Sequence, residues 1–257
     1  MSKKETLGDL IKGYEANYDL TLPKRTPLVL RIDGRAFHTF TRGFEKPYDE
    51  IFIKSMQETM KMLCENIPGC QFGYVESDEI SLLVWETNND ASPWFANRLQ
   101  KLCSMSASMA TLYFNQNFRK ILSSYSEDEK PKHYKAIEIG GMFDSRVFVI
   151  PESVINPYFV WRQNDCTRNS ILGLSMIHYS PKQMQNLKCN ELQNKLLTEK
   201  NINWNDEPAV HKRGTCAYRV IDNEELQSHK WILDYEMPIL TEDKEFVYSK
   251  IIFPPED

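Results

Sequence analysis

Two patterns of apolar and polar positions alternate along the chain. Short apolar runs predict β-strands, and apolar residues at every third or fourth position predict helices. The apolar run at residues 27–33 (PLVLRID) is typical of a β-strand. In residues 49–66, apolar side chains recur every three or four positions, which predicts a helix with one buried face that begins after Asp49. Residues 71–76 and 80–86 predict the two strands of a hairpin with Ser-Asp-Glu near its turn.

The same patterns continue to about residue 220 and predict a mixed fold. Ser92 and Pro93 suit the start of a helix that ends near Asn117 and has a centre rich in small residues, SMSASMA. The other segments are a charged loop at 119–135, a strand at 146–150, helices at 157–178 and 181–198, and a last strand at 214–220. This order predicts an α+β fold, with an antiparallel sheet and helices mostly on one face.

Length and composition predict a folded protein with a real core. The chain has 257 residues, 41% of them hydrophobic, and lacks an apolar run of the roughly 20 residues that span a bilayer. The segment MSKKETLGDL has no apolar signal core, so we expect a cytoplasmic protein with no membrane partner. Six cysteines lie far apart, without a CxxC or Cys/His cluster, which favours reduced thiols over a zinc site.

Charge is distributed unevenly along the chain. Residues 222–257 carry ten acids and three bases, whereas residues 1–221 carry 26 acids and 28 bases. A net charge of −5 argues against a general nucleic-acid coat, but a nearly neutral body leaves room for a local phosphate-binding face. We therefore expect residues 222–257 to be an acidic C-terminal extension with a solvated surface.

Two carboxylates stand at predicted turns. Asp33 ends the first strand and is followed by Gly34, while Asp78 lies in the hairpin turn. At one sheet edge they could hold Mg²⁺, which prefers oxygen ligands and substrate phosphates, and two such ions suit an in-line phosphoryl displacement. Turn N–H groups could cradle a triphosphate, with Lys46 adding positive charge. Ordinary polar turns explain the same residues, so spacing alone leaves both interpretations open.

A family resemblance adds to this picture. RIDGRAFHTF, then EKP, YVESDEIS, FDSRVFVIP, YFVWRQNDCTRNS and NINW…HKRGT follow one another in order. Together they resemble the tRNA-His guanylyltransferase family over about residues 7–220. The resemblance implies a polymerase-palm-like catalytic domain with a C-terminal helical part in residues 1–221, and a homotetramer.

The resemblance also implies site residues. Asp33 and Asp78 would hold two magnesium ions with the Gly34 carbonyl as a further ligand, and Glu79 would support them as a third catalytic carboxylate. Glu76 shares a strand face with Asp78 but receives no role. The nucleotide triphosphate would be bound by Asp33, Gly34, Arg35, Ala36, Phe37, His38, Lys46, Ser77 and Asp78.

RNA contacts are expected from basic residues in or near these motifs, although each of these residues alone could equally be a solvated surface residue. Arg98 and Lys101 lie three apart on a predicted helix, and so share a face. Arg119, Lys120 and Lys135 flank the predicted loop. The residues assigned to RNA are Arg98, Lys101, Arg146, Asn169, Lys212 and Arg213.

The resemblance implies a reaction and leaves its substrate open. Such enzymes add nucleotides to the 5′ end of tRNA in the 3′–5′ direction, using ATP, GTP or other NTPs. The branch dedicated to tRNA-His carries H-I-N-N after D-C, whereas this chain has T-R-N-S at residues 167–170, where only Asn169 matches. It looks more like the guanylyltransferase-like branch, which repairs truncated tRNAs by templated addition. The alternatives are the dedicated enzyme, a palm-type nucleotide cyclase and a catalytically silent RNA-binding protein.

Overall fold

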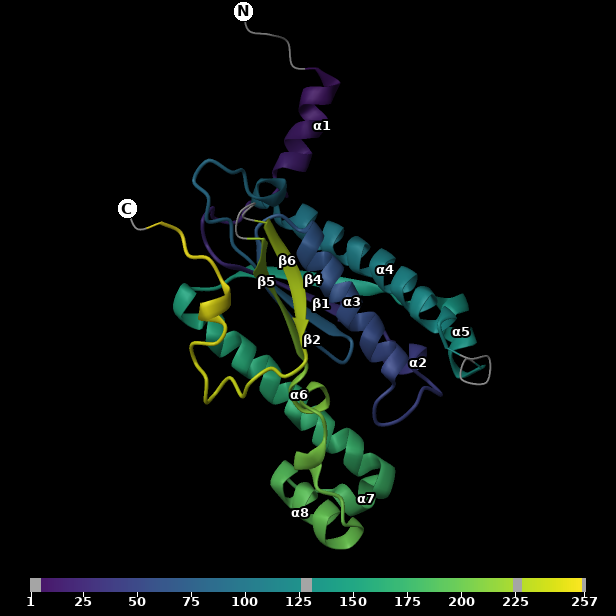
Figure 1. Ribbon diagram of the computed structural model, residues 1–257. Coiled ribbons are helices and arrows are strands. Elements are labelled where there is room, and N and C mark those ends of the chain that lie inside the picture. Colours follow the sequence, from purple (N-terminus) through teal and green to yellow (C-terminus); the bar gives the residue numbers. More distant parts are fainter. Residues whose placement is uncertain (1–5, 126–130, 224–227, 256–257) are drawn as a thin grey trace, which may run out of the picture.

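A six-stranded antiparallel sheet organises the computed structural model, which describes residues 6–125, 131–223 and 228–255 (Figure 1). The strand order is β4-β1-β3-β2-β5-β6, and every pairing is antiparallel. The α+β prediction is therefore confirmed. The strands are β1 (Leu28–Gly34), β2 (Cys70–Glu76), β3 (Glu79–Val84), β4 (Phe143–Val149), β5 (Thr215–Asn223) and β6 (Ser228–Asp234).

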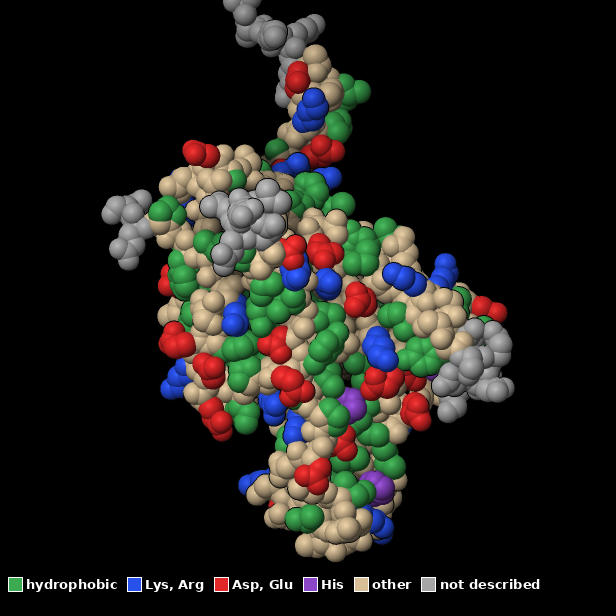
Figure 2. All heavy atoms as spheres, viewed as in Figure 1, with side chains coloured by type: hydrophobic (Ala, Val, Ile, Leu, Met, Phe, Trp, Pro, Cys, Tyr) green, Lys and Arg blue, Asp and Glu red, His purple; other side chains and the backbone are tan. Residues whose placement is uncertain are grey.

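On the surface, Figure 2 shows acidic and basic side chains interspersed over the face in view.

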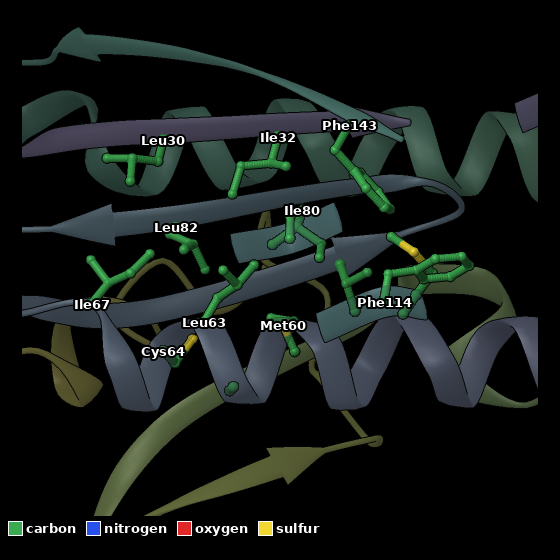
Figure 3. Packing of buried hydrophobic residues seen from close by; sticks show 14 of the residues in the cluster. Leu30, Ile32, Met60, Leu63, Cys64, Ile67, Ile80, Leu82, Phe114 and Phe143 are labelled. Carbon is green, nitrogen blue, oxygen red and sulfur yellow. The ribbon is translucent and has the colours of Figure 1, made fainter. Parts of the chain in front are cut away.

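Helices α3 (Glu50–Asn66) and α4 (Leu99–Ser123) cover one face of the sheet. Alternate side chains of β1 and β3, such as Ile32 and Leu82, point at this layer because successive strand residues face opposite sides. Figure 3 shows them packed over Met60 and Leu63 of α3, which the helical period predicts on its buried side. Burial of each such side chain contributes about 1.5–3 kcal/mol to the free energy of folding.

The opposite face is covered as well, by α6 (Ile155–His178) and the C-terminal segment. Phe72 and Tyr74 of β2 pack against Phe159 of α6, with ring centroids 4.9 and 6.4 Å apart. This differs from the expectation of helices mostly on one face. All seven residues of β2 are buried, and a strand buried on both faces needs a layer on each.

The acidic C-terminal segment is part of the sheet and of the core. β5 runs through the boundary expected between residues 221 and 222, and β6 pairs with it. Met237, Leu240 and Val247 are fully buried in the second layer. The expectation of a merely solvated surface was wrong, because the charges lie between apolar residues that face inward.

Three helix boundaries differ from the predictions. A short 3-10 turn, η1 (Trp94–Asn97), precedes α4, which begins at Leu99 because Phe95, Ala96 and Asn97 have positive φ. The predicted loop at 119–135 is largely helical, since α4 reaches Ser123 and α5 (Pro131–Ile139) follows; residues 126–130 lie outside the described residues. The predicted helix 181–198 is two helices, α7 (Pro181–Met184) and α8 (Cys189–Lys200), separated by Asn186 with a φ of 64°.

Helices α1, α7 and α8 lie at the periphery of the structure. α1 (Leu7–Ala16) begins with a Thr6 capping box, buries no side chain and projects from the body (Figure 1). α7 and α8 lie at the far end of α6 around a small cluster of Leu174, Tyr179 and Leu196. None of the helices in the described residues is both long and apolar enough to cross a membrane. The other short elements are α2 (Phe37–Phe40), η2 (Glu152–Val154), η3 (Trp204–Asp206), α9 (Ala209–Arg213) and η4 (Tyr248–Lys250).

Candidate active site

Two turns meet at one end of the sheet and bring the predicted carboxylates together. Asp33 is the next-to-last residue of β1 and pairs with Glu79 of β3, while Asp78 lies in the β2–β3 turn. The Gly34 N–H donates a hydrogen bond of 3.0 Å to the Asp78 carbonyl oxygen, which ties the two turns directly. Ser77 takes a φ of 48° in this tight turn, and its hydroxyl donates to the Asp78 carboxylate at 3.1 Å.

The chain folds back sharply after β1. The Arg35 N–H donates to the Met142 carbonyl at 2.8 Å, and Ala36 adopts the left-handed conformation, with φ 56° and ψ 35°. A Cβ added to Gly34 would lie 2.4 Å from Phe37 Cδ2, so only glycine fits at the end of β1. α2 starts directly after this turn, which keeps the backbone close to the carboxylates.

A polar cavity of about 420 Å³ lies beside the two turns. Every residue expected to bind nucleotide lines this cavity except Arg35. The Phe37 side chain is buried among Phe40, Phe114 and Phe143, with centroids 4.9–5.4 Å away, so it anchors the turn in the core. The lining residues are Asp33, Gly34, Ala36, Phe37, His38, Thr41, Phe44, Glu45, Lys46, Pro47, Asp49, Phe52, Ser77 and Asp78.

Asp49 fixes the outer wall of the cavity and is not free to bind a ligand. Its carboxylate accepts hydrogen bonds from the Phe52 N–H at 2.9 Å and the Glu45 N–H at 3.0 Å. It also lies 2.9 Å from Nε2 of the buried His133, which α5 contributes. The loop that carries Lys46 is therefore held against the start of α3 and against α5.

A buried arginine that sequence reasoning missed lies behind the hairpin. Arg162 of α6 contacts Glu76 at 2.8 Å, Glu79 at 2.7 Å and Asp165 at 3.0 Å. Glu79 is thus turned toward α6 and does not line the polar cavity. The contact between Glu76 and Arg162 joins residues 86 positions apart, so no local pattern could have predicted it.

Burial dominates the electrostatics of the hairpin carboxyls. It raises the pKa of Asp78, and the neighbouring Asp33 adds to the rise. It likewise raises the pKa of Glu79, against the opposing effect of Arg162 and Arg31. Burial raises the pKa of Glu76 to about 8, although Arg162 opposes it. A nearby cation favours the charged form of each of these groups.

The donor set fits magnesium. Among the described residues, no lysine or arginine forms an ion pair with Asp33 or Asp78, so their charge is left for another cation. No group of three or more His, Cys, Asp or Glu side chains in the described ranges could hold a metal alone. Two carboxylates and a carbonyl suit an ion that completes its shell with water and phosphate oxygens.

Comparison with known proteins places this site in a family. A family model described as tRNAHis guanylyltransferase matches residues 8–151, more than half of the chain. The chain belongs to the tRNAHis guanylyltransferase family. It is therefore a nucleotidyltransferase, which excludes the silent RNA-binding protein considered from the sequence.

The chain is also similar to individual proteins over most of its length. The tRNA(His) guanylyltransferase of Debaryomyces hansenii is 30% identical over 83% of this chain and 80% of its own length. An uncharacterized protein of Acanthamoeba polyphaga mimivirus, R259, is 29% identical over 82% of this chain and 76% of its length.

Solved structures of the family share the fold. A bacterial tRNA(His) guanylyltransferase-like protein in complex with ATP superposes with a TM-score of 0.83 and 39% identity, covering 96% of this chain and 99% of that chain. The tRNA(His) guanylyltransferase of Saccharomyces cerevisiae gives a TM-score of 0.64 and 26% identity, covering 79% and 91%. The sheet flanked by helices is thus the architecture of this family.

The residues expected to contact RNA are scattered over the described surface. Arg98 is the N-cap of α4 and bonds Asp19 at 2.9 Å, so it does not share a helix face with Lys101 as predicted. Arg146 lies exposed in the middle of β4. The other three lie near α9: Asn169 borders a second cavity of about 170 Å³, the Lys212 ammonium donates to the Asn205 carbonyl, and Arg213 donates to the Met237 carbonyl.

Proposed function

We propose that this protein adds nucleotides in the 3′–5′ direction to the 5′ end of truncated tRNA, with the opposing strand as template. The observation that carries the proposal is the meeting of Asp33 and Asp78 beside a polar cavity of about 420 Å³. Two carboxylates that line one cavity with Lys46 and His38 suit a triphosphate whose α-phosphorus is attacked in line.

The reaction proceeds in two nucleotidyl transfers. The 5′-phosphate of the tRNA attacks the α-phosphorus of ATP, forms a 5′-5′ anhydride and releases pyrophosphate. The 3′-hydroxyl of an incoming NTP then attacks the activated 5′-phosphate and releases AMP. Neither step needs a protein nucleophile, which agrees with a site built of carboxylates, backbone N–H groups and bases.

The chain's own residues bind and orient the reactants. Asp33, Asp78 and the Gly34 carbonyl are the residues that would hold two magnesium ions, which when bound neutralise the charge that develops on the phosphate oxygens. Backbone N–H groups of the turn at Ala36 and Phe37 donate to the triphosphate. Arg162 holds Glu79 away from the cavity, so the Glu79 carboxylate does not face the phosphates there.

Two observations favour templated repair over dedicated addition of one guanosine to tRNA-His. The stretch T-R-N-S at 167–170 lacks the histidine and second asparagine of the dedicated branch. The bacterial guanylyltransferase-like protein also superposes better than the yeast enzyme, with TM-scores of 0.83 and 0.64. Base pairing with the 3′ strand would then select the nucleotide. The homotetramer and the cytoplasmic location stay predictions.

The test uses a 3′-labelled tRNA that lacks its first 5′ nucleotide. Each NTP is supplied singly with ATP and Mg²⁺, and the product length is measured for the wild type, Asp78→Ala and a matched exposed control, Asp90→Ala. We expect the wild type and Asp90→Ala to add only the nucleotide that pairs with the opposing base, and Asp78→Ala to add none.

Other outcomes assign the site differently. Addition of guanosine whatever the opposing base indicates the dedicated tRNA-His enzyme. A cyclic nucleotide formed without RNA indicates a cyclase. Full activity of Asp78→Ala would show that the carboxylate pair is not the catalytic site.

A further inference from the structure

Trp161 on α6 is a half-exposed tryptophan whose ring contacts three other side chains. The residue is 50% exposed to solvent. The guanidinium carbon of Arg162 lies 4.3 Å from the ring centroid and that of Arg31 lies 5.5 Å away. The Tyr158 ring meets it edge-on at 5.8 Å. Such contacts fix the indole before any partner arrives.

The support beneath Trp161 is rigid. The Arg162 side chain is only 7% exposed and is paired with Glu76, Glu79 and Asp165. Because these pairs hold the guanidinium in place, they also hold the indole that lies on it. An indole that is held by cations and left half in water can stack on the base of a nucleic acid.

The position of this surface relates it to the carboxylates. Arg31 precedes Asp33 by two residues on β1, so both side chains lie on the same sheet face, roughly 7 Å apart along the strand. Arg31 pairs across the sheet with Arg146 of β4, whose side chain is exposed. None of Arg31, Arg146 and Trp161 lines the polar cavity, although Asp33 does.

Arg31 beside the exposed indole and Arg146 on the neighbouring strand suit single-stranded nucleic acid, although Arg146 also lies 3.9 Å from Asp144. Bases stack on aromatic rings and on guanidinium planes, and the same cations attract phosphates. We propose that Trp161, Arg31 and Arg146 form a stacking platform for the 5′-terminal nucleotides of the RNA strand that is extended at Asp33 and Asp78. This inference rests on the proposed function, and it gives the RNA strand a surface separate from the cavity that would take the triphosphate.

The chain offers a matched control for Trp161. Trp231 of β6 also has an arginine over its ring, with the Arg219 guanidinium carbon 5.8 Å from the centroid, but it lies at the far edge of the sheet. Both tryptophans can be replaced by alanine, and the melting temperature of each variant reports its folding. Trp161→Phe keeps an aromatic face at the platform.

Binding of a fluorescent acceptor-stem hairpin that lacks its first 5′ nucleotide is measured by anisotropy, with Mg²⁺ and without nucleotides. We expect Trp161→Ala to weaken binding about tenfold, in line with loss of one stacked base. Trp161→Phe and Trp231→Ala should stay within about twofold of the wild type. ATP binding, measured by equilibrium dialysis, should be unchanged in all three variants.

A crosslink locates the RNA end independently of these variants. With 4-thiouridine as the 5′-terminal nucleotide, irradiation should join the RNA to the peptide that contains Trp161. Wild-type affinity of Trp161→Ala, an equal loss in Trp231→Ala, or a crosslink elsewhere would overturn the platform. Because no nucleotide is added in these measurements, they can support the platform even if the proposed reaction fails.

Discussion

At the scale of single residues, the site concentrates carboxyl groups where burial opposes their charge. Glu76, Asp78 and Glu79 lie on one hairpin, and only Glu76 and Glu79 are paired with Arg162. The folded protein therefore holds protons on this hairpin more readily than the unfolded chain does.

Replacing Glu76 by glutamine should flatten the pH dependence of stability. Burial raises the pKa of Glu76 from 4.5 to about 8, so unfolding releases a proton between these values. The free energy of unfolding of the wild type should fall as pH rises through this window, and that of Glu76→Gln should fall less. Urea unfolding in the presence of a chelator, from pH 5 to 8.5, measures the free energy of unfolding of both proteins. Glu199→Gln, at an exposed position, is the control. Parallel pH profiles for the wild type and Glu76→Gln would contradict the expectation.

Replacing Gly34 by alanine should weaken both folding and nucleotide binding. The added Cβ would press on Phe37, whose ring is confined by Phe40, Phe114 and Phe143. We expect a loss of about 1–3 kcal/mol in unfolding free energy and a weaker affinity for ATP. Gly13→Ala is the control, because nothing lies within 4 Å of its Cβ. Equal stability of both variants would show that the turn tolerates a side chain.

Sequence reasoning located Asp33 and Asp78, but for a physical reason it missed the residues that pair with the neighbouring carboxylates. Asp33 and Asp78 each stand where an apolar strand meets a turn, which is a local signal. Arg162 and His133 act on the site through contacts with residues 86 and 84 positions away, and such contacts leave no local pattern.

At the scale of elements, prediction succeeded where a helical period or an apolar run dominates a segment. β1, α3 and the β2–β3 hairpin appear close to their expected bounds, because α3 has one buried face and each strand is a mostly apolar run that ends at a turn. The start of α4 and the break between α7 and α8 depend on residues with positive φ, such as Ala96 and Asn186, which the apolar pattern does not report. β6 escaped notice because its apolar run is short and surrounded by charge.

The C-terminal segment should prove structural when tested with two neighbouring residues. Leu240 is fully buried, whereas Ile239 is 41% exposed. Leu240→Ala should lower the free energy of unfolding by about 2–4 kcal/mol, and Ile239→Ala by less than about 1 kcal/mol. Chemical unfolding of both variants gives the comparison. Similarly small losses of unfolding free energy in both variants would indicate that this segment is a solvated extension after all.

At the scale of the whole molecule, the structure has a large body and a small projecting part. The body contains the sheet and two apolar layers, while α7, α8 and the end of α6 extend from it around three buried residues (Figure 1). Few buried apolar contacts predict local opening at a low free energy.

Hydrogen exchange should reveal this difference. Amides of α8, which buries only Leu192 and Leu196, should exchange much faster than those of β3, in which five of six residues are buried. Exchange followed by mass spectrometry at the peptide level resolves the two segments. Equal protection would mean that the body and the projecting part open together.

The place of β2 in the sheet has a consequence for the order of folding. Its neighbours are β3, which follows it closely in the chain, and β5, which begins about 140 residues later at Thr215. During synthesis the outer edge of β2 therefore stays unpaired until most of the chain has left the ribosome. In the folded protein β2 is buried on both faces, and such a strand binds other exposed strands while its edge is unpaired. The nascent chain is therefore exposed to aggregation at this edge until β5 is synthesised and pairs with β2.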